Sequence, residues 1–182
     1  MKIVRAVLAG GLAAGVLDIL YAFVVYGPLS GALGLPSSTS PAMVLQSVAG
    51  GWIGRDAAFA GGAQTAALGA LTHFAIALIM ASVFVLAAAV LRSLTRNAWF
   101  WGIVYGLVLF VVMNYVVVPL SAAADGHFAS SIAEASARIG EAIDRALAFR
   151  RPLLLAGTIL THTVFVGVPI ALAAKRYLGQ QD

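Results

Sequence analysis

Long runs of apolar residues, separated by shorter polar stretches, dominate the pattern of this chain. Four runs each have about the 20 residues that a helix needs to cross a hydrocarbon core of about 30 Å. They cover approximately residues 3–25, 66–91, 99–120 and 153–174. Apart from Arg5 near its start, the first run carries one charged residue, Asp18, and the other three carry none. The pattern predicts an all-α membrane protein with four transmembrane helices in one integral membrane domain, residues 1–182.

The composition supports this class and excludes several kinds of site. Hydrophobic residues make up 62% of the chain and charged residues 10%, whereas soluble domains have roughly half and a quarter. The absence of cysteine excludes disulfides and thiolate metal sites. The first run is longer than the apolar core of a signal peptide, and no small-residue cleavage site precedes Tyr26. We therefore expect it to be a retained helix.

The positions of lysine and arginine predict the orientation of the helices. Six basic residues lie near helix ends on the side of the N-terminus: Lys2, Arg5, Arg92, Arg96, Lys175 and Arg176. Five fall on the other side: Arg55, Arg138, Arg145, Arg150 and Arg151. The positive-inside rule gives most weight to short connections such as residues 92–97, so we expect cytoplasmic N- and C-termini. Basic cytoplasmic flanks also account for the net charge of +4 without a nucleic acid partner.

Matching motifs predict an internal duplication. The first and third helices share a Gly-x-x-x-Gly pair and a Pro-Leu-Ser exit at one offset of 91 residues, and the second and fourth share Thr-His at an offset of 89. The positions are Gly11, Gly15, Pro28, Leu29, Ser30, Thr72 and His73, matched by Gly102, Gly106, Pro119, Leu120, Ser121, Thr161 and His162. We predict two parallel helix-hairpin repeats, residues 1–95 and 96–182. The glycine pairs indicate close packing of helices one and three within the bundle, with dimerisation through them as an alternative.

The two outer connections are predicted to contain short amphipathic helices. In the first, Ser40-Pro41 offers an N-cap followed by proline at the first helical position. In the second, apolar residues recur at helical spacing, with the i,i+4 pairs Glu134–Arg138 and Glu141–Arg145 on the polar side. The apolar stripe consists of Phe128, Ile132, Ile139, Ile143 and Leu147. These helices would lie on the periplasmic membrane surface or cap the bundle, as a lid or as a docking site for a membrane-protein partner.

Each predicted span contains a polar residue, and these residues form the candidate site. Asp18, His73, Asn114 and His162 all fall within a layer roughly 6 Å thick, just outside the midplane, for a rise of about 1.5 Å per residue. We expect the four to meet, with Asp18 and a histidine as the natural pair. Tyr21 and Tyr115 are neighbours that complete the candidate set.

Three functions are compatible with this polar layer. The first is a transport-like or proton-responsive site, because ionisable residues inside a membrane are costly and commonly functional. The second is a structural or partner subunit, alone or as a homo-oligomer, in which polar residues only hold the helices together. The third, a haem or metal bound by His73 and His162, has no supporting motif, so no cofactor is predicted. Gly-x-Ser-x-Gly and His-Glu-x-x-His are missing from the sequence, and we expect no enzyme.

Several motifs resemble a group of small bacterial four-span proteins, and more distantly the YagU-like inner-membrane proteins. They are Asp18-x-x-Tyr21, residues 46–51 (QSVAGG), Phe59-x-Gly-Gly62, His73-Phe74, Tyr105-Gly106, residues 113–121 (MNYVVVPLS) and residues 165–172 (FVGVPIAL). The similarity covers nearly the whole chain, and residues 113–121 are its most distinctive part. It implies a bacterial inner-membrane protein with four helices. It implies no particular activity.

Overall fold

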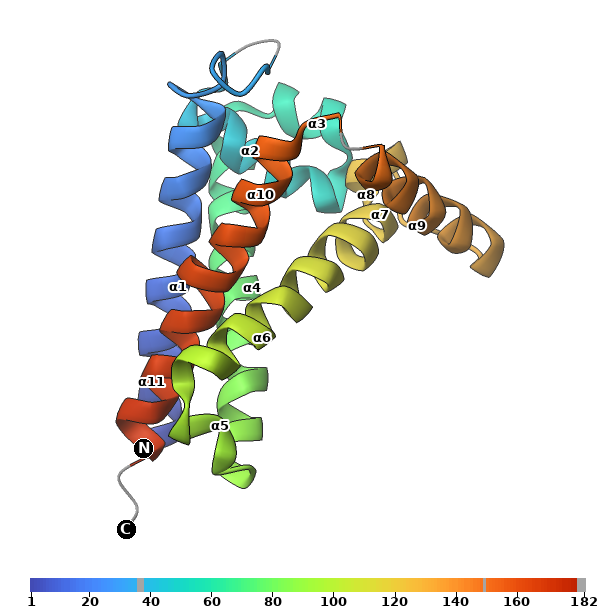
Figure 1. Ribbon diagram of the computed structural model, residues 1–182. Helices are drawn as coiled ribbons and strands as arrows, with labels where there is room; N and C mark the ends of the chain where they lie inside the picture. Colours follow the sequence, from blue (N-terminus) through green and yellow to red (C-terminus); the bar gives the residue numbers. More distant parts are fainter. Residues whose placement is uncertain (36–37, 149, 180–182) are drawn as a thin grey trace. The chain divides into compact units, whose positions relative to one another are not determined.

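The computed structural model describes residues 1–35, 38–148 and 150–179, and the regular structure that these residues form is helical throughout. Four helices in this part of the chain are long and apolar enough to cross a membrane (Figure 1). They are α1 (Lys2–Tyr26), α4 (Gly62–Val90), the helix α6–η1–α7 (Ala98–Leu120) and the helix α10–η2–α11 (Pro152–Leu178). The predicted all-α class and the four predicted apolar helices are confirmed, and the chain is a multi-pass membrane protein.

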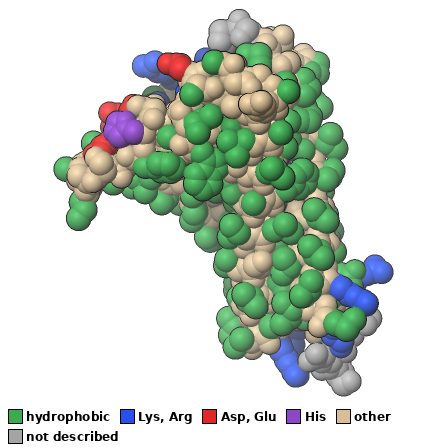
Figure 2. Space-filling model, turned by 180° about the vertical axis from the view of Figure 1, so that it is seen from behind, with side chains coloured by type: hydrophobic (Ala, Val, Ile, Leu, Met, Phe, Trp, Pro, Cys, Tyr) green, Lys and Arg blue, Asp and Glu red, His purple; other side chains and the backbone are tan. Residues whose placement is uncertain are grey.

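The outward faces of the four spans are apolar. In the most apolar stretch of each span, only 22% to 33% of the residues are buried. Large side chains such as Leu71, Ile79 and Val90 face outward, and Figure 2 shows hydrophobic side chains over the long helices. Water would solvate such a surface poorly, whereas lipid acyl chains match it. The spans are therefore suited to contact with a lipid bilayer.

The chain forms two compact units. Unit 1 contains Met1–Tyr21, Phe74–Phe110 and Gly157–Asp182, and unit 2 contains Ala22–His73 and Val111–Ala156. Both units draw on both halves of the sequence, so their boundaries differ from the boundary of the predicted repeats at residue 95.

Small side chains dominate the core of unit 1. Its buried cluster contains Ala6, Ala14, Ala81, Phe84, Val85, Ala88, Ala98, Leu109, Val166, Ile170, Ala171 and Ala174. Because alanine has little volume, the helix backbones can approach closely. Tyr105 lies at the edge of this cluster, where its hydroxyl donates a hydrogen bond to the Met80 carbonyl at 2.7 Å and its ring contacts Phe84. The half-buried phenol therefore has the hydrogen-bond partner that it needs in an apolar setting.

Both Gly-x-x-x-Gly pairs lie at close helix contacts in unit 1. A Cβ added at Gly11 would lie 2.9 Å from a Leu78 side-chain carbon, and one added at Gly15 would lie 2.8 Å from the Phe74 ring, both on α4. The second pair faces the fourth span. There a Cβ at Gly102 would lie 2.7 Å from Val168 Cα, and one at Gly106 would lie 2.5 Å from Thr163 Cα. The glycines of spans one and three thus pack on spans two and four respectively.

Unit 2 contains the short helices α2 (Pro41–Ile53), α3 (Arg55–Ala60) and α8 (Ala122–Asp125) and the longer α9 (Ile132–Leu147). Helix α2 begins as predicted, because Ser40 Oγ accepts a hydrogen bond from the Met43 N–H at 3.2 Å and Pro41 occupies the first helical turn. The sequence of α2 contains no charged residue. Of the two predicted amphipathic helices, only α9 therefore combines an apolar stripe with a charged side.

Polar side chains attach α2 to the first half of α4. Gln46 Nε2 donates to the Gly62 carbonyl at 2.9 Å, and Trp52 Nε1 donates to Thr72 Oγ1 at 3.0 Å. Between these two bonds, a Cβ at Gly69 would collide with the Leu45 carbonyl. Glycine at position 69 therefore allows the two helices to approach closely.

Candidate functional site

Asp18 is a half-buried acidic residue within the first span, and it faces the fourth. Its Oδ1 accepts a hydrogen bond from Thr161 Oγ1 at 3.2 Å, and Thr161 is itself buried. Within the described part of the chain, Asp18 forms no ion pair with a lysine or arginine. An acidic group at this position would normally be paired, because an isolated carboxylate is costly in an apolar medium. Here one hydroxyl is its hydrogen-bonding partner.

Tyr21 lies one turn after Asp18 and faces the same side of the fourth span. Its ring contacts Phe165 edge to face, with the centroids 5.9 Å apart. Its hydroxyl oxygen occupies the space that a Cβ would need at Gly157. Gly157, Thr161 and Phe165 follow one another at i,i+4 spacing and so form one stripe on the fourth helix. Asp18 and Tyr21 both pack on this stripe.

His162 belongs to the same unit but makes different contacts. Its Nδ1 lies 2.8 Å from the Thr158 carbonyl, and since a carbonyl can only accept, Nδ1 carries the hydrogen. The imidazole also contacts Phe110 edge to face. Nε2 is then the acceptor nitrogen, and no described residue bonds to it. The hydrogen-bonding partner of Asp18 is therefore Thr161, the residue before His162, which is one of the two histidines that we considered as its pair.

Two widened helical turns lie within the third and fourth spans. The π-helices η1 (Met113–Val117) and η2 (Thr161–Gly167) are each followed by Val-Pro. Val118 N–H bonds to the Met113 carbonyl and Val168 N–H to the Thr163 carbonyl, which are i,i+5 bonds. The following proline ring would crowd the carbonyl four residues earlier in an α-helix, and the wider turn relieves this conflict. Asn114 and Tyr115 lie in the first of these turns, and Thr161 and His162 lie in the second.

His73, Asn114 and Tyr115 belong to unit 2. His73 follows Thr72 on α4, and Thr72 accepts the hydrogen bond from Trp52 described above. Asn114 and Tyr115 lie in η1, and all three side chains are half-buried. The six residues predicted to form one polar site are thus divided equally between the two units. The expectation that the four intramembrane polar residues meet stays a prediction.

The described residues contain no group of three or more His, Asp or Glu side chains that could hold a metal ion. The geometry of His162 leaves Nε2 as the nitrogen that would bind a haem or metal. The polar groups of the candidate site in unit 1 are the carboxyl of Asp18 on the first span and the hydroxyl of Thr161 and imidazole of His162 on the fourth. Such groups exchange protons or bind small polar ligands.

A second polar cluster, around Arg138 of α9, was not anticipated as a buried site. The arginine is only 5% exposed, and Nη1 donates to the carbonyls of Pro119, Ser121 and His127 at 3.4, 3.5 and 3.0 Å. Two of these carbonyls lie at the end of the third span, where α7 (Val118–Leu120) stops. Arg138 therefore satisfies helix-end carbonyls that would otherwise lack a donor.

Three side chains complete the cluster. Arg138 Nη2 bonds to Glu134, and Nε lies 3.0 Å from Asp125 Oδ2, an ion-pair contact too bent to be a hydrogen bond. His127 Nε2 lies 2.9 Å from Glu134 Oε1. The sequence showed the Glu134–Arg138 pair but not its burial. One feature of the sequence could have indicated this burial: the third span ends nearby, and the carbonyls at a helix end require hydrogen-bond donors.

Hydrogen bonds hold the Glu134 carboxylate in its charged form. The backbone N–H and the hydroxyl of Ser130 both donate to Oε2 at 2.8 Å. These bonds lower the pKa of Glu134 to about 2, and the positive charge of Arg138 contributes less. Glu134 also follows the N-cap residue Ser131, whose Oγ accepts its backbone N–H at 3.1 Å. The start of α9 is thus fixed by an ionised glutamate.

The fold and these contacts define a multi-pass helical membrane protein with an acidic group inside one span. No protein-family model, no curated protein and no solved structure matches the chain. The similarity to the YagU-like proteins rests on the motifs quoted above and stays a prediction.

Proposed function

We propose that this chain is a bacterial inner-membrane protein in which Asp18 is the proton-binding group of a transport-like or proton-responsive site. The observation that carries the proposal is the hydrogen bond between Asp18 and Thr161 of the facing helix. The proposal includes no catalytic step and no cofactor.

The Asp18–Thr161 contact suits both protonation states of the acid. A hydroxyl donates to an ionised carboxylate, as it does in this arrangement. After protonation the acid can donate to Thr161 Oγ1, whose own hydrogen then turns to a carbonyl one turn back in the helix. A lysine or arginine partner would instead favour the charged form alone. Pairing with a hydroxyl therefore leaves Asp18 able to gain and lose a proton.

His162, which follows Thr161 on the fourth span, supplies a second proton acceptor in unit 1. Its Nδ1–H is held by the Thr158 carbonyl, so Nε2 is the nitrogen that would take up a proton or bind a polar substrate. A site that moves protons needs at least two groups that can exchange them. Asp18 and His162 are the two in unit 1 that we propose for this role.

Equivalent packing contacts support the proposed duplication. Gly15 packs against Phe74, which follows the Thr-His pair of the first half, and Gly106 packs against Thr163, which follows the Thr-His pair of the second. The glycines correspond at the offset of 91 residues and their partners at 89. Two parallel helix hairpins descended from one unit would produce this correspondence.

The proposed orientation has cytoplasmic N- and C-termini. Within unit 1, the N-terminus, the connection α5 (Ser93–Arg96) and the end of α11 (Val168–Leu178) lie at one end (Figure 1). Lysine and arginine side chains gather there (Figure 2). They belong to Lys2, Arg5, Arg92, Arg96, Lys175 and Arg176. This basic end is the one that the positive-inside rule assigns to the cytoplasm.

Helix α9 would then lie at the periplasmic membrane surface. Its inward side buries Arg138 and Ala142, while Ile132 and Leu147 of the apolar stripe are 87% and 66% exposed. An apolar stripe turned away from the protein interior is suited to the boundary between lipid headgroups and acyl chains. The exposed stripe thus supports membrane contact along α9.

The decisive experiment is proton flux into liposomes that contain the purified protein, driven by an imposed pH gradient and read with an internal pH-sensitive dye. Asp18→Asn keeps the shape of the side chain and an acceptor for Thr161 but removes the exchangeable proton. We expect its flux to fall to that of empty liposomes, with little change in melting temperature. Thr161→Ser, which keeps the hydroxyl, is the matched control and should retain flux.

Other outcomes would favour the remaining functions. Wild-type flux no greater than that of empty liposomes contradicts the proposal. A lower melting temperature of Asp18→Asn with unchanged flux indicates that the polar residues serve only as helix contacts of a structural subunit. The visible spectrum of the same preparation tests the alternative of haem bound by His73 and His162, because a haem would give a Soret band.

A further inference from the structure

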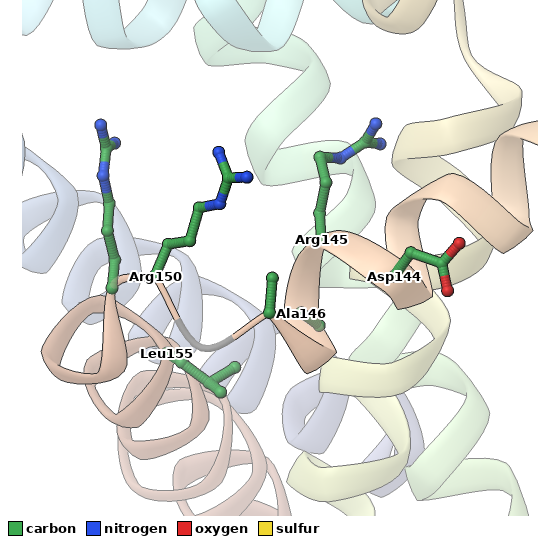
Figure 3. Close-up of a pocket in the computed structure, with 7 residues that line it drawn as sticks. Asp144, Arg145, Ala146, Arg150 and Leu155 are labelled. Carbon is green, nitrogen blue, oxygen red and sulfur yellow. The ribbon is translucent and has the colours of Figure 1, made fainter.

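A basic cavity lies in unit 2 between the end of α9 and the start of α10 (Pro152–Leu160). Its volume is about 510 Å³, and Asp144, Arg145, Arg150, Arg151 and Leu155 line it together with two alanines. Figure 3 shows Arg145 and Arg150 extending in the same direction, while the Asp144 carboxylate is directed away from Arg150. Guanidinium groups from α9 and from the residues that directly precede α10 therefore share one side of the cavity.

The positive charge of this cavity is only partly compensated. Arg145 pairs with Glu141 at 3.4 Å, and both side chains are largely exposed. Arg150 and Arg151 form no ion pair within the described part of the chain. Exposed pairs such as Arg145–Glu141 are weak and exchange readily with other anions. The cavity thus offers up to three guanidinium groups against one lining carboxylate.

We propose that this cavity binds the phosphate group of an anionic phospholipid. Guanidinium groups match phosphate oxygens in geometry and charge, and two donors from one arginine can bind one phosphate. The cavity lies where the fourth span begins, at Pro152, which is the depth of lipid headgroups. Leu155 lines the cavity on the span itself, where an acyl chain would pass.

The bound phosphate also explains the location of these arginines. In the orientation proposed above, Arg145, Arg150 and Arg151 lie on the periplasmic side, where the positive-inside rule disfavours basic residues near spans. A lipid phosphate would stabilise them there. The inference requires only that α10 enters the bilayer. It is independent of the function proposed for Asp18.

Native mass spectrometry of the detergent-solubilised protein tests this inference. Phosphatidylglycerol, phosphatidylcholine and inorganic phosphate are titrated separately into the wild type and two double variants. Arg150→Gln/Arg151→Gln removes two cavity charges, and Arg92→Gln/Arg96→Gln removes two exposed charges elsewhere. We expect the wild type to prefer phosphatidylglycerol over phosphatidylcholine, and the first double variant to lose about tenfold or more in phosphatidylglycerol affinity. The second should bind as the wild type does.

Each further outcome has a defined meaning. An equal loss in both double variants, or no preference in the wild type, overturns the inference, because net charge or apolar contact alone would then explain binding. Phosphate binding at the cavity as tight as lipid binding would identify free phosphate as the ligand and overturn the assignment to lipid. Asp18→Asn should retain full lipid preference, which separates this result from the test of proton flux.

Discussion

Asp18 and Arg138 are two ionisable side chains that the protein solvates in different ways. Asp18 has one neutral partner, the hydroxyl of Thr161. Arg138 has carbonyls of Pro119, Ser121 and His127 and the carboxylate of Glu134 as acceptors. The many acceptors around Arg138 give it a structural role at the end of the third span. The single neutral partner of Asp18 is the contact on which the proposed proton-binding role rests.

Gly106 is a second single residue whose substitution has a predictable effect, because its position has no room for a side chain. A Cβ there would lie 2.5 Å from Thr163 Cα and even closer to a backbone carbonyl, so no rotamer change can relieve the clash. We expect Gly106→Ala to lower the free energy of unfolding by about 1–3 kcal/mol. The measurement is denaturant or thermal unfolding in detergent.

Gly140→Ala is the matched control for this substitution. Gly140 lies inside α9, has no atom within 4 Å of an added Cβ and does not have a positive φ. Alanine there should raise stability by roughly 0.5–1 kcal/mol, because it restricts the unfolded chain. If the two variants shifted stability alike, close backbone packing at Gly106 would not be the cause.

At the scale of the element, α9 combines a local helix start with a tertiary attachment. Ser131 caps the helix, Ser130 bonds to Glu134, and Glu134 holds Arg138 against the end of the third span. Local sequence rules predicted the helix and its i,i+4 pair. They did not predict that the arginine side faces inward while Ile132 and Leu147 of the apolar stripe are exposed, because that choice depends on contacts with the end of the third span.

The anchoring of α9 should weaken only in strong acid. The folded-state pKa of Glu134, about 2, lies below its ordinary value of 4.5, so ionised Glu134 stabilises the fold. This contribution is complete above about pH 4.5 and is lost as the pH falls towards 2. We expect the melting temperature of Glu134→Gln to lie below that of the wild type from pH 7 to 4.5, with the difference closing near pH 2.

Glu141→Gln provides the comparison for the acid titration. It removes an exposed ion pair of the same spacing, with Arg145, and should change the melting temperature little at any pH. A difference between Glu134→Gln and the wild type that persisted at pH 2 would show that Glu134 acts through packing and not through its charge.

At the scale of the whole molecule, membrane orientation decides which surface each polar cluster faces. The proposed orientation places α5 in the cytoplasm and α9 in the periplasm. It rests on the basic residues at one end of unit 1 and on the rule that such residues stay inside. The basic residues near α9 argue against this orientation, and the proposed lipid-phosphate site would account for them.

The cysteine-free sequence makes the orientation directly measurable. Ser136 of α9 and Ser93 of α5 are both exposed. A membrane-impermeant maleimide added to intact spheroplasts should label Ser136→Cys, and it should label Ser93→Cys only after the membrane is opened. The reverse labelling pattern would contradict the orientation, and labelling of both in intact spheroplasts would indicate mixed insertion.

Hydropathy and residue spacing were enough to predict the class of the protein and much of its local structure. Runs of about 20 apolar residues must form helices in lipid, because backbone polar groups find no other partners there. Interactions between residues close in sequence were also predictable: Ser40 caps α2, and Glu134 pairs with Arg138 one turn later. The presence of Asp18 in a span, and thus of a candidate site, was equally visible from hydropathy alone.

Which side chains meet depends on contacts between helices. Thr161, at the start of the widened turn ahead of Pro169, became the hydrogen-bonding partner of Asp18. Arg138 is buried where it donates hydrogen bonds to the carbonyls of Pro119 and Ser121 at the end of the third span. The spacing of residues along one helix determines which side chains share a face of that helix. Contacts between helices depend on where small residues let backbones approach, and the sequence pattern does not specify that.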